Sequence, residues 1–524
     1  MTETKTRPVT PGSDVTWSVS ADGFDTQSGT ISDISESQSL DIYLLGSYGT
    51  FDKKVKDVQV NDSATWILLN DGTLLGCGDN SFGQQGSGKQ GSSYYVTTFT
   101  QRLTDVAQIF TTGYTTWALK TDGTLWGCGY GGYGQQGNGT SSSYNYVTTF
   151  TQRLTDVAKV SISRVTTWAL KTDGTLWGCG YNGNGQQGSG QSGSSYNVTT
   201  FTQRLTDVKE VFANYSTTWV LKTDGTLWGC GDNYYGQQGS GDTNNVTTFT
   251  QRLTDVDKVS TSTGRTTWAL KTDGTLWSCG DNAYGQQGSG DTNNVTTFTQ
   301  RLTDVAQVFA LDETTWAIKT DNTLWGCGNN KYGNQGSGTS GDGTKVTTFT
   351  QRLTDVAQVS ASGGTTWALK TDGTLWGCGV NESGQQSSGD KNDVTIFTQR
   401  FTDVAQVSVS SSTTWAIKTD GILWGCGNNN YGQQGNGKAG IYDYVTIFTK
   451  RNPSVTGYNS AKLTINPTPS DAVVTINSES VKTKDIRKGT SAEWSVSKAG
   501  YTTQTGTISH IYDDTILNIT LEEE

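Results

Sequence analysis

Hydrophobic and polar residues alternate in short runs along most of the chain, and the same runs recur. In residues 105–154 the alternating segments are VAQIF from Val106, TTWALKT from Thr115, TLWGCG from Thr124 and VTTFTQRL from Val147. Alternation with a period of two predicts half-buried β-strands. The Asp-Gly between the second and third segments predicts a tight hairpin turn, and the glycine-rich stretch before the fourth predicts a loop. The pattern therefore predicts a sheet of four antiparallel strands.

This four-stranded unit recurs along the chain. A Thr-Trp pair marks each copy, with its tryptophan at Trp66, Trp117, Trp168, Trp219, Trp268, Trp316, Trp367 and Trp415. The steps are 51, 51, 51, 49, 48, 51 and 48 residues. Such a period is typical of repeat folds in which each unit buries its faces against its neighbours. We therefore predict an all-β chain with an eight-bladed β-propeller over residues 46–457, four strands to a blade.

Two features of the units bear on blade packing and ring closure. Each unit carries a tryptophan pair, such as Trp117 and Trp126, that we expect to fill the space between blades. The first unit has Leu75 in place of the second tryptophan, which suits a terminal blade. Ahead of it, GTFDKKVKDV from Gly49 is similar to the fourth strand of a unit. This extra strand could close the ring on the last blade, in competition with VTIFTKR at Val445, and the sequence leaves that choice open.

The unit resembles the regulator of chromosome condensation repeat. The likeness lies in the period, the aliphatic AL strand, the Asp-Gly hairpin, the aromatic–glycine return strand and G-Q-x-G, and it covers roughly residues 46 to 457. The resemblance implies a propeller, for which that family usually has seven blades, so a seven-bladed ring is the alternative. Cys128 and its equivalents stand where the family commonly has an aromatic residue. The family's exchange-factor activity uses an insertion and a basic arm that are not visible in this sequence, so only the fold is implied.

Small β-modules are predicted at both ends of the chain. Residues 458–524 look like a PEGA-type module, and their WSVSKAGYTTQTGTISHI from Trp494 reappears as WSVSADGFDTQSGTISDI from Trp17. Residues 1–45 therefore form a partial module that lacks the leading hairpin, with an unpaired edge. Two alternatives stay open: the partial module folds as a shortened sandwich within the chain, or a strand of another virion protein completes it and anchors the chain.

Charge and hydropathy exclude two classes of partner. The chain has 37 basic and 48 acidic residues, a net charge of −11, and no basic stripe, which disfavours nucleic acid as a partner. No window approaches eighteen apolar residues, and the first residues have no apolar core of a signal peptide. We expect no membrane insertion and no signal peptide. A virion surface protein, made in a host cytoplasm, reconciles this with a composition typical of exposed β-proteins.

Candidate catalytic groups are scarce. His510 is the one histidine, so we expect no histidine-based triad or zinc site, and we predict no catalytic residue, no metal and no cofactor. The recurrent aspartates, such as Asp122, belong to the Asp-Gly turns. The eight cysteines are spaced by one unit, unlike a C-x-x-C motif, and we expect small buried thiols. A disulfide would require their strand to line the axis. Arg102 and Asp105 recur together, which suggests a repeated ion pair or backbone clamp.

The units differ mainly in two loops, before the Thr-Trp pair and after the cysteine. These loops are built from Tyr, Ser, Gly, Asn and Asp, the residues of adaptable recognition surfaces. They suit glycans, whose ring faces stack on aromatic side chains and whose hydroxyls need amide partners; ordinary loop drift is the alternative. The candidate ligand contacts are Tyr94, Tyr95, Tyr130, Tyr133, Tyr144, Tyr146, Tyr234, Tyr235, Tyr284, Tyr332, Tyr431, Tyr442 and Tyr444.

Three functions remain after these exclusions. The first is a non-enzymatic phage virion surface protein, on the tail or capsid, whose propeller attaches to host glycans through many weak sites. The second is a structural decoration protein without a ligand. The third is an intracellular propeller scaffold or exchange-factor-like regulator, against which the acidic charge and uniform repeats count.

Overall fold

The structure is a computed structural model of the chain, and it falls into two compact units, residues 1–54 and 55–524. It describes residues 13–19, 27–34, 54–451 and 460–520, apart from 93, 263–264, 312, 477–479, 488–489 and 512–514. Among these residues no helix has the length and apolar character needed to cross a bilayer. The one helical element in this described part of the chain is a short 3₁₀ turn, η1 (Ser194–Tyr196).

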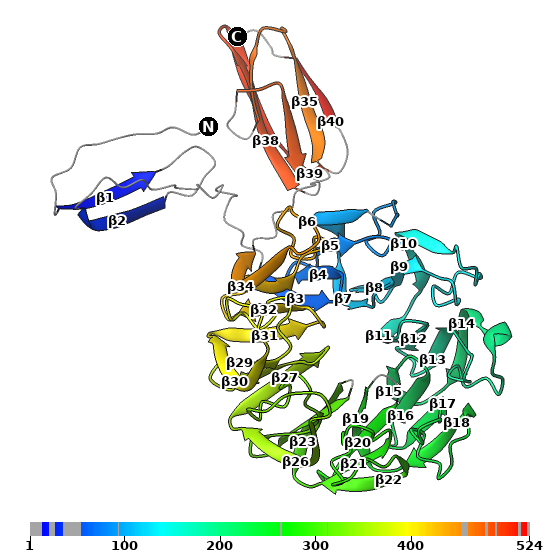
Figure 1. The fold of residues 1–524 in the computed structure, drawn as a ribbon. Coiled ribbons are helices and arrows are strands. Elements are labelled where there is room, and N and C mark those ends of the chain that lie inside the picture. The colour runs from blue at the N-terminus through cyan, green and yellow to red at the C-terminus, as the bar shows by residue number, and fades with distance from the viewer. Residues whose placement is uncertain are drawn as a thin grey trace. The chain divides into compact units, whose positions relative to one another are not determined.

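Residues 55–451 form eight antiparallel sheets of four strands each, arranged in a ring (Figure 1). The first four blades are β3–β6 (Val55–Val60, Ala64–Leu69, Leu74–Asp79, Tyr95–Leu103), β7–β10 (Val106–Thr111, Thr115–Lys120, Leu125–Tyr130, Tyr146–Leu154), β11–β14 (Val157–Ile162, Thr166–Lys171, Leu176–Gly180, Val198–Leu205) and β15–β18 (Val208–Ala213, Thr217–Lys222, Leu227–Gly231, Val246–Leu253). The last four are β19–β22 (Val256–Ser262, Thr266–Lys271, Leu276–Gly280, Val295–Leu302), β23–β26 (Val305–Leu311, Thr314–Lys319, Leu324–Asn329, Lys345–Leu353), β27–β30 (Val356–Ser362, Thr365–Lys370, Leu375–Gly379, Val394–Phe401) and β31–β34 (Val404–Val409, Thr413–Lys418, Leu423–Asn428, Tyr444–Arg451). The predicted eight-bladed propeller is confirmed, and the seven-bladed alternative is wrong.

The Asp-Gly hairpins form as the sequence predicts. In the second blade Gly123 has a φ of +79°, in the left-handed region that glycine adopts without strain. The Asp122 carboxylate accepts hydrogen bonds from the backbone N–H and the hydroxyl of Thr124, at 2.9 and 2.6 Å. Asn322, which replaces the usual glycine, has a φ of +62° in the same turn. These aspartates are therefore turn-forming residues.

One tryptophan of each pair fills the space between blades. Trp117 is fully buried, and its ring meets Phe201 of the next blade edge to face, with centroids 5.9 Å apart. All eight interfaces contain this pair, at 5.8–6.0 Å. The second tryptophan is less buried, and the prediction holds for it only in part. Trp126 is half-buried, its indole N–H donates to the Thr124 hydroxyl at 2.9 Å and Lys120 lies over its ring at 5.1 Å. Its equivalents Trp228, Trp376 and Trp424 pack against the hydrophobic cores between blades.

Each cysteine joins its blade to the preceding one. The Cys128 thiol donates to the carbonyl of Gln84 at 3.3 Å, and all eight thiols make the equivalent contact at 3.3–3.5 Å. The cysteines are free and buried, as predicted, and burial raises the pKa of the Cys128 thiol far above its ordinary value. The thiols are thus neutral donors within the scaffold.

The ring closes between the first and eighth blades without an exchanged strand. At this closure interface the Cys77 thiol donates to the Gln433 carbonyl at 3.4 Å, and Phe99 meets Trp415 at 6.0 Å, as in the other interfaces. Of the two alternatives left open, VTIFTKR takes the place: β34 is the outer strand of the eighth blade, and residues 55–58 belong to β3, the first strand of the first blade. Residues 49–53 lie outside the described residues.

The recurrent arginine and aspartate are not ion-paired. Asp105 has a φ of +62°, its carbonyl accepts the Thr121 N–H at 2.8 Å, and its carboxylate accepts the Thr104 hydroxyl at 2.8 Å. No ion pair joins Arg102 to Asp105, two residues that the structure describes, and the Arg102 Nε is buried without a hydrogen-bond partner there. The backbone clamp is therefore the correct alternative for the aspartate.

The flanking modules share one hairpin. In residues 1–54, β1 (Ser13–Val19) pairs with β2 (Gln27–Ile34), with Trp17 opposite Gly29. In the C-terminal module, β38 (Thr490–Lys498) pairs with β39 (Tyr501–Ile511) in the same register, with Trp494 opposite Gly506. That module also contains β35 (Ser460–Thr468), β36 (Val473–Ile476), β37 (Thr483–Arg487) and β40 (Thr515–Thr520), in sheets ordered β37-β35-β40 and β36-β38-β39. Within the described residues β1 has no counterpart of β36.

Candidate functional site

The blade topology collects the variable loops on one side of the ring. In each four-stranded meander, the turn between the first and second strands and the loop between the third and fourth lie on the same face. The Asp-Gly turns lie on the opposite face. We call these the variable-loop face and the constant face. The candidate tyrosines all lie in the variable loops or at the strand ends that adjoin them.

The candidate tyrosines differ widely in exposure. Tyr144, Tyr442 and Tyr234 are the most exposed, at 83, 78 and 72%. Tyr133 and Tyr431 are partly exposed, at 37 and 38%. The half-buried ones are Tyr94, Tyr95, Tyr130, Tyr146, Tyr235, Tyr284, Tyr332 and Tyr444. Only part of the predicted contact set therefore offers a free ring face.

Three of the candidates belong to an aromatic cluster that spans the first three blades. Tyr130 lies 6.0 Å from Tyr133 and 5.9 Å from Tyr146, measured between ring centroids. The cluster extends to residues that were not among the candidates: Phe82, Tyr114 and Tyr181. An alignment of the units on their Thr-Trp tryptophan would have found Phe82, since it occupies the position of Tyr133 in the preceding unit.

The cluster can stack on a ligand but cannot supply acid–base chemistry near neutral pH. Burial, together with the neighbouring Tyr133 and Tyr146, raises the pKa of Tyr130 above that of free tyrosine, so its phenol stays neutral. The Arg164 guanidinium lies 4.1 Å from the Tyr114 centroid and covers that ring. What remains is an aromatic surface with neutral hydroxyl groups.

The other tyrosines form separate groups around the ring. Tyr95 and Tyr431 meet across the closure interface, with centroids 5.4 Å apart. Tyr234 packs against Tyr235 at 5.0 Å, and Arg265 of the next blade lies 5.1 Å from the Tyr235 ring. The candidates therefore do not converge on one site; they give several small aromatic surfaces on one face.

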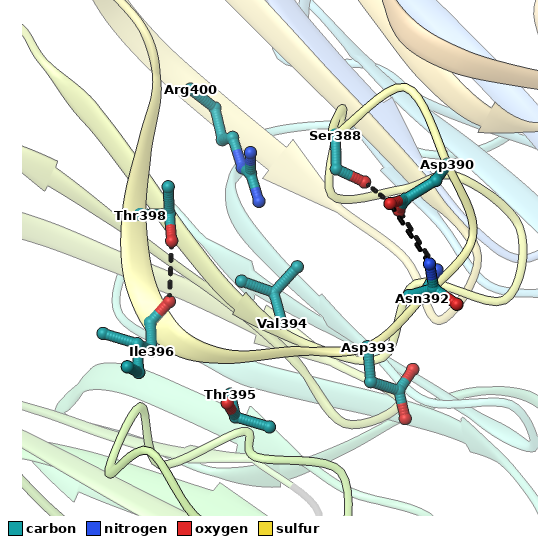
Figure 2. Close-up of a pocket in the computed structure, with 9 residues that line it drawn as sticks. All are labelled: Ser388, Asp390, Asn392, Asp393, Val394, Thr395, Ile396, Thr398 and Arg400. Carbon is teal, nitrogen blue, oxygen red and sulfur yellow. Dashed lines mark hydrogen bonds between the residues drawn. The ribbon is translucent and has the colours of Figure 1, made fainter.

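The seventh blade has a polar hollow of about 390 Å³ between the loop after β29 and strand β30 (Figure 2). Asp390 faces Arg400 across it, but its carboxylate accepts hydrogen bonds from the Ser388 hydroxyl at 2.7 Å and the Asn392 N–H at 3.1 Å. These bonds lower the pKa of Asp390 and hold it in its own loop. No aromatic side chain lines the hollow, so it offers no surface for stacking.

No metal-binding constellation is present in the part of the chain that the structure describes. No group of three or more His, Cys, Asp or Glu side chains is close enough to hold an ion there. His510 lies in β39 of the C-terminal module, away in sequence from the propeller loops.

Two known families match parts of the chain. The regulator of chromosome condensation (RCC1) repeat matches residues 55–84, 208–237 and 404–433, which hold the first three strands of the first, fourth and eighth blades. The chain therefore contains RCC1 repeats, and its propeller is of the RCC1 type. The head fiber dimeric protein-like domain matches residues 460–520. The PEGA-type resemblance of that module is not confirmed.

Individual proteins are also similar to parts of the chain. The head fiber dimeric protein of Bacteroides phage crAss001 is 54% identical over 43 residues, which is 8% of this chain and 35% of that protein. The match thus spans about a third of that relative's length. Prp20p of Saccharomyces cerevisiae is 17% identical, with 65% of this chain and 89% of that chain covered and a TM-score of 0.50. Human WBSCR16 is 19% identical over 63% of this chain and 93% of its own, with a TM-score of 0.49.

Proposed function

We propose that this chain is a structural protein of a phage virion that displays its propeller on the particle surface. The observation that carries the virion assignment is the match of residues 460–520 to the head fiber dimeric protein-like domain. The local identity to a phage head fiber dimeric protein supports it. The C-terminal module is then the part that belongs with the particle, and the propeller is its display domain.

The displayed propeller, in this proposal, binds glycans of the host surface through its variable-loop face. The constant face repeats the same turn in blade after blade, whereas the other face carries exposed tyrosines beside amide and hydroxyl groups. Aromatic rings stack on the apolar faces of sugars, and amides bind their hydroxyls. Several weak sites on one ring, multiplied over the copies on a particle, give a high avidity. No enzymatic activity is part of this function.

The N-terminal hairpin is proposed to anchor the chain to another virion protein. Its register is that of β38–β39, and in the C-terminal module β38 also pairs with β36. The free edge of β1 in the described residues is therefore suited to accept a β36-like strand from another chain. A fragment of residues 1–45 that folds as a monomer without a partner would contradict this anchor.

Two measurements test the proposal. Mass spectrometry and antibody labelling of purified particles should find the chain on virions; its absence overturns the virion assignment. Binding of the full chain to a glycan array is then compared between the wild type and Tyr133→Ala/Tyr144→Ala, which alters two exposed rings. We expect the double variant to lose signal. Presence on virions without binding by either protein would favour the ligand-free decoration protein.

A further inference from the structure

A second hollow lies on the variable-loop face, between the sixth and seventh blades. It measures about 250 Å³, and its walls include Glu313, Asn329, Tyr332 and Asn334 of the sixth blade and the Gly363–Gly364 turn of the seventh. This volume is below the usual range for sites that hold drug-sized ligands and suits a single small ring. We call it the blade 6–7 pocket.

One cause of the pocket is a departure from the repeat at Asn334. In the other seven units this position is glutamine, and its side-chain oxygen accepts the backbone N–H two residues earlier at 2.8–2.9 Å. Asn334 is one methylene shorter and turns its Nδ2 to the carbonyl of Asn329 at 2.8 Å. Its Oδ1 is left with no hydrogen-bond partner, although the residue is only 3% exposed. A buried acceptor without a partner is costly unless a ligand or water supplies a donor.

The second cause is the turn of the neighbouring blade. In two other interfaces a large side chain of this turn covers the loop aromatic of the preceding blade: Tyr114 lies 4.6 Å from Phe82, and Arg265 lies 5.1 Å from Tyr235. At the blade 6–7 interface the equivalent residue is Gly364, where a Cβ atom would come within 3.2 Å of Tyr332 Cδ2. The same Cβ would lie 2.8 Å from Val380 Cγ2, so the backbone of the turn packs close to Tyr332 and no side chain at this position covers the ring.

The chemistry of the pocket selects its ligand. Glu313 is its one charged lining residue, and its carboxylate accepts the Asn329 amide at 2.5 Å. No lysine or arginine lines the pocket, and the nearby Lys331 ammonium, 5.2 Å from the Tyr332 ring centroid, is paired with Asp342 at 2.9 Å. The Asn334 oxygen has no donor, the carboxylate can accept one more beside Asn329 and Tyr284, and Tyr332 supplies the aromatic surface.

We propose that the blade 6–7 pocket binds one neutral or amino-substituted sugar ring, with ring hydroxyls donating to Glu313 and Asn334 beside Tyr332. This inference rests on the proposed glycan-binding function and gives it one specific site. It also excludes acidic sugars from that site, because their carboxylates would face Glu313.

The test is saturation-transfer NMR of the full chain with methyl glycosides of a neutral hexose, an N-acetylhexosamine and a hexuronic acid. We expect signals from one or both neutral sugars and none from the acid. Asn334→Gln restores the residue of the other units and should weaken binding about tenfold, the equivalent of one lost hydrogen bond. The control is Gln385→Asn, which makes the reverse change at the equivalent position of the seventh blade. Ser383 stands there in the place of Tyr332, so no aromatic ring lies beside it and binding should be unchanged.

The outcomes separate this inference from the function on which it rests. Binding of the acid alone, or equal binding by the wild type and Asn334→Gln with matching melting temperatures, overturns the pocket. If the same variant still binds the glycan array like the wild type, the proposed function stands without this site. If methyl glycosides bind the pocket but the array and host cells are not bound, the proposed attachment fails and the pocket remains.

Discussion

The two faces of the propeller lie at opposite ends of the same strands, yet one repeats its residues from blade to blade and the other varies them. On the constant face the same aspartate, glycine, threonine and tryptophan repeat, with hydrogen bonds that agree within about 0.1 Å between blades, as in the Thr124 and Thr175 turns. On the variable-loop face equivalent positions carry Tyr114, Arg265 or Gly364. Repetition thus marks the residues that hold blades together, and variation marks the residues free to acquire binding.

The largest effect should come from the repeated interface tryptophan. Trp219→Ala removes a fully buried ring that packs against Phe298 of the next blade, 5.8 Å away. We expect a loss of about 3–5 kcal/mol in the free energy of unfolding, measured by urea denaturation. Trp228→Ala, at the half-buried second tryptophan, is the control and should cost clearly less. Equal losses would refute the distinction between the two tryptophans.

A smaller loss is expected at the glycine beside that tryptophan. A Cβ on Gly229 would lie 2.6 Å from Trp219 Cζ3 and 2.5 Å from Gln238 Oε1. Gly229→Ala should therefore overpack the interface and cost about 1–3 kcal/mol, seen as a lower melting temperature. The fifth blade already has Ser278 there, with its hydroxyl bonded to Arg301 Nε at 3.1 Å. Ser278→Ala, the matched control, should change stability less; the opposite order would contradict the packing argument.

The constant face should also respond to acid. Hydrogen bonds from the Thr124 hydroxyl and N–H lower the pKa of Asp122, and its equivalents behave alike. Because the folded pKa lies below the unfolded value of about 3.9, this stabilisation is present above about pH 4 and lost as pH falls through the folded pKa. The melting temperature of Asp122→Asn/Asp173→Asn should lie below that of the wild type at pH 7 and approach it near pH 3. A constant gap would show that these carboxylates do not titrate as described.

The smallest effect on stability is expected on the variable-loop face. Tyr144 is 83% exposed, so Tyr144→Ala should change the free energy of unfolding by no more than about 0.5 kcal/mol. Glycan binding by this variant should fall, as measured on the array. A clear loss of stability would show that Tyr144 belongs to the scaffold. Binding equal to that of the wild type would show that Tyr144 does not contact the glycan.

The repeats allowed most of the fold to be predicted from the sequence. Alternation and the tryptophan period gave strands, blades and their number, and the Asp-Gly dipeptide gave the hairpin. The closure strand stayed open because Gly49 to Val58 resembles both a fourth strand and the link before a first strand. Pairing decides between these, and pairing is a long-range contact that local similarity does not encode.

For the candidate site, the sequence predicted the types of residue but not how they are arranged. The tyrosine-rich loops lie on one face, as their place in the repeat implies, but Tyr130 and Tyr146 pack against other aromatic rings. The blade 6–7 pocket depends on two departures, Asn334 and Gly364, which are 30 residues apart and meet across a blade interface. Aligned units would reveal both substitutions, yet only the packed ring shows that they line the same hollow.

The closure interface also determines how the ring carries load. Val55 begins the first blade and Arg451 ends the eighth, so both connections to the flanking modules leave the ring at the same interface. Tension between those modules, as in a particle projection under flow, would pull these two blades apart. Two backbone bonds cross the closure interface, from the Val55 N–H to the Gly421 carbonyl at 3.2 Å and from the Gly437 N–H to the Thr97 carbonyl at 2.9 Å, and side chains supply the other contacts named above. Force spectroscopy on the full chain should show this interface yielding first, and the ring then opening blade by blade from its ends.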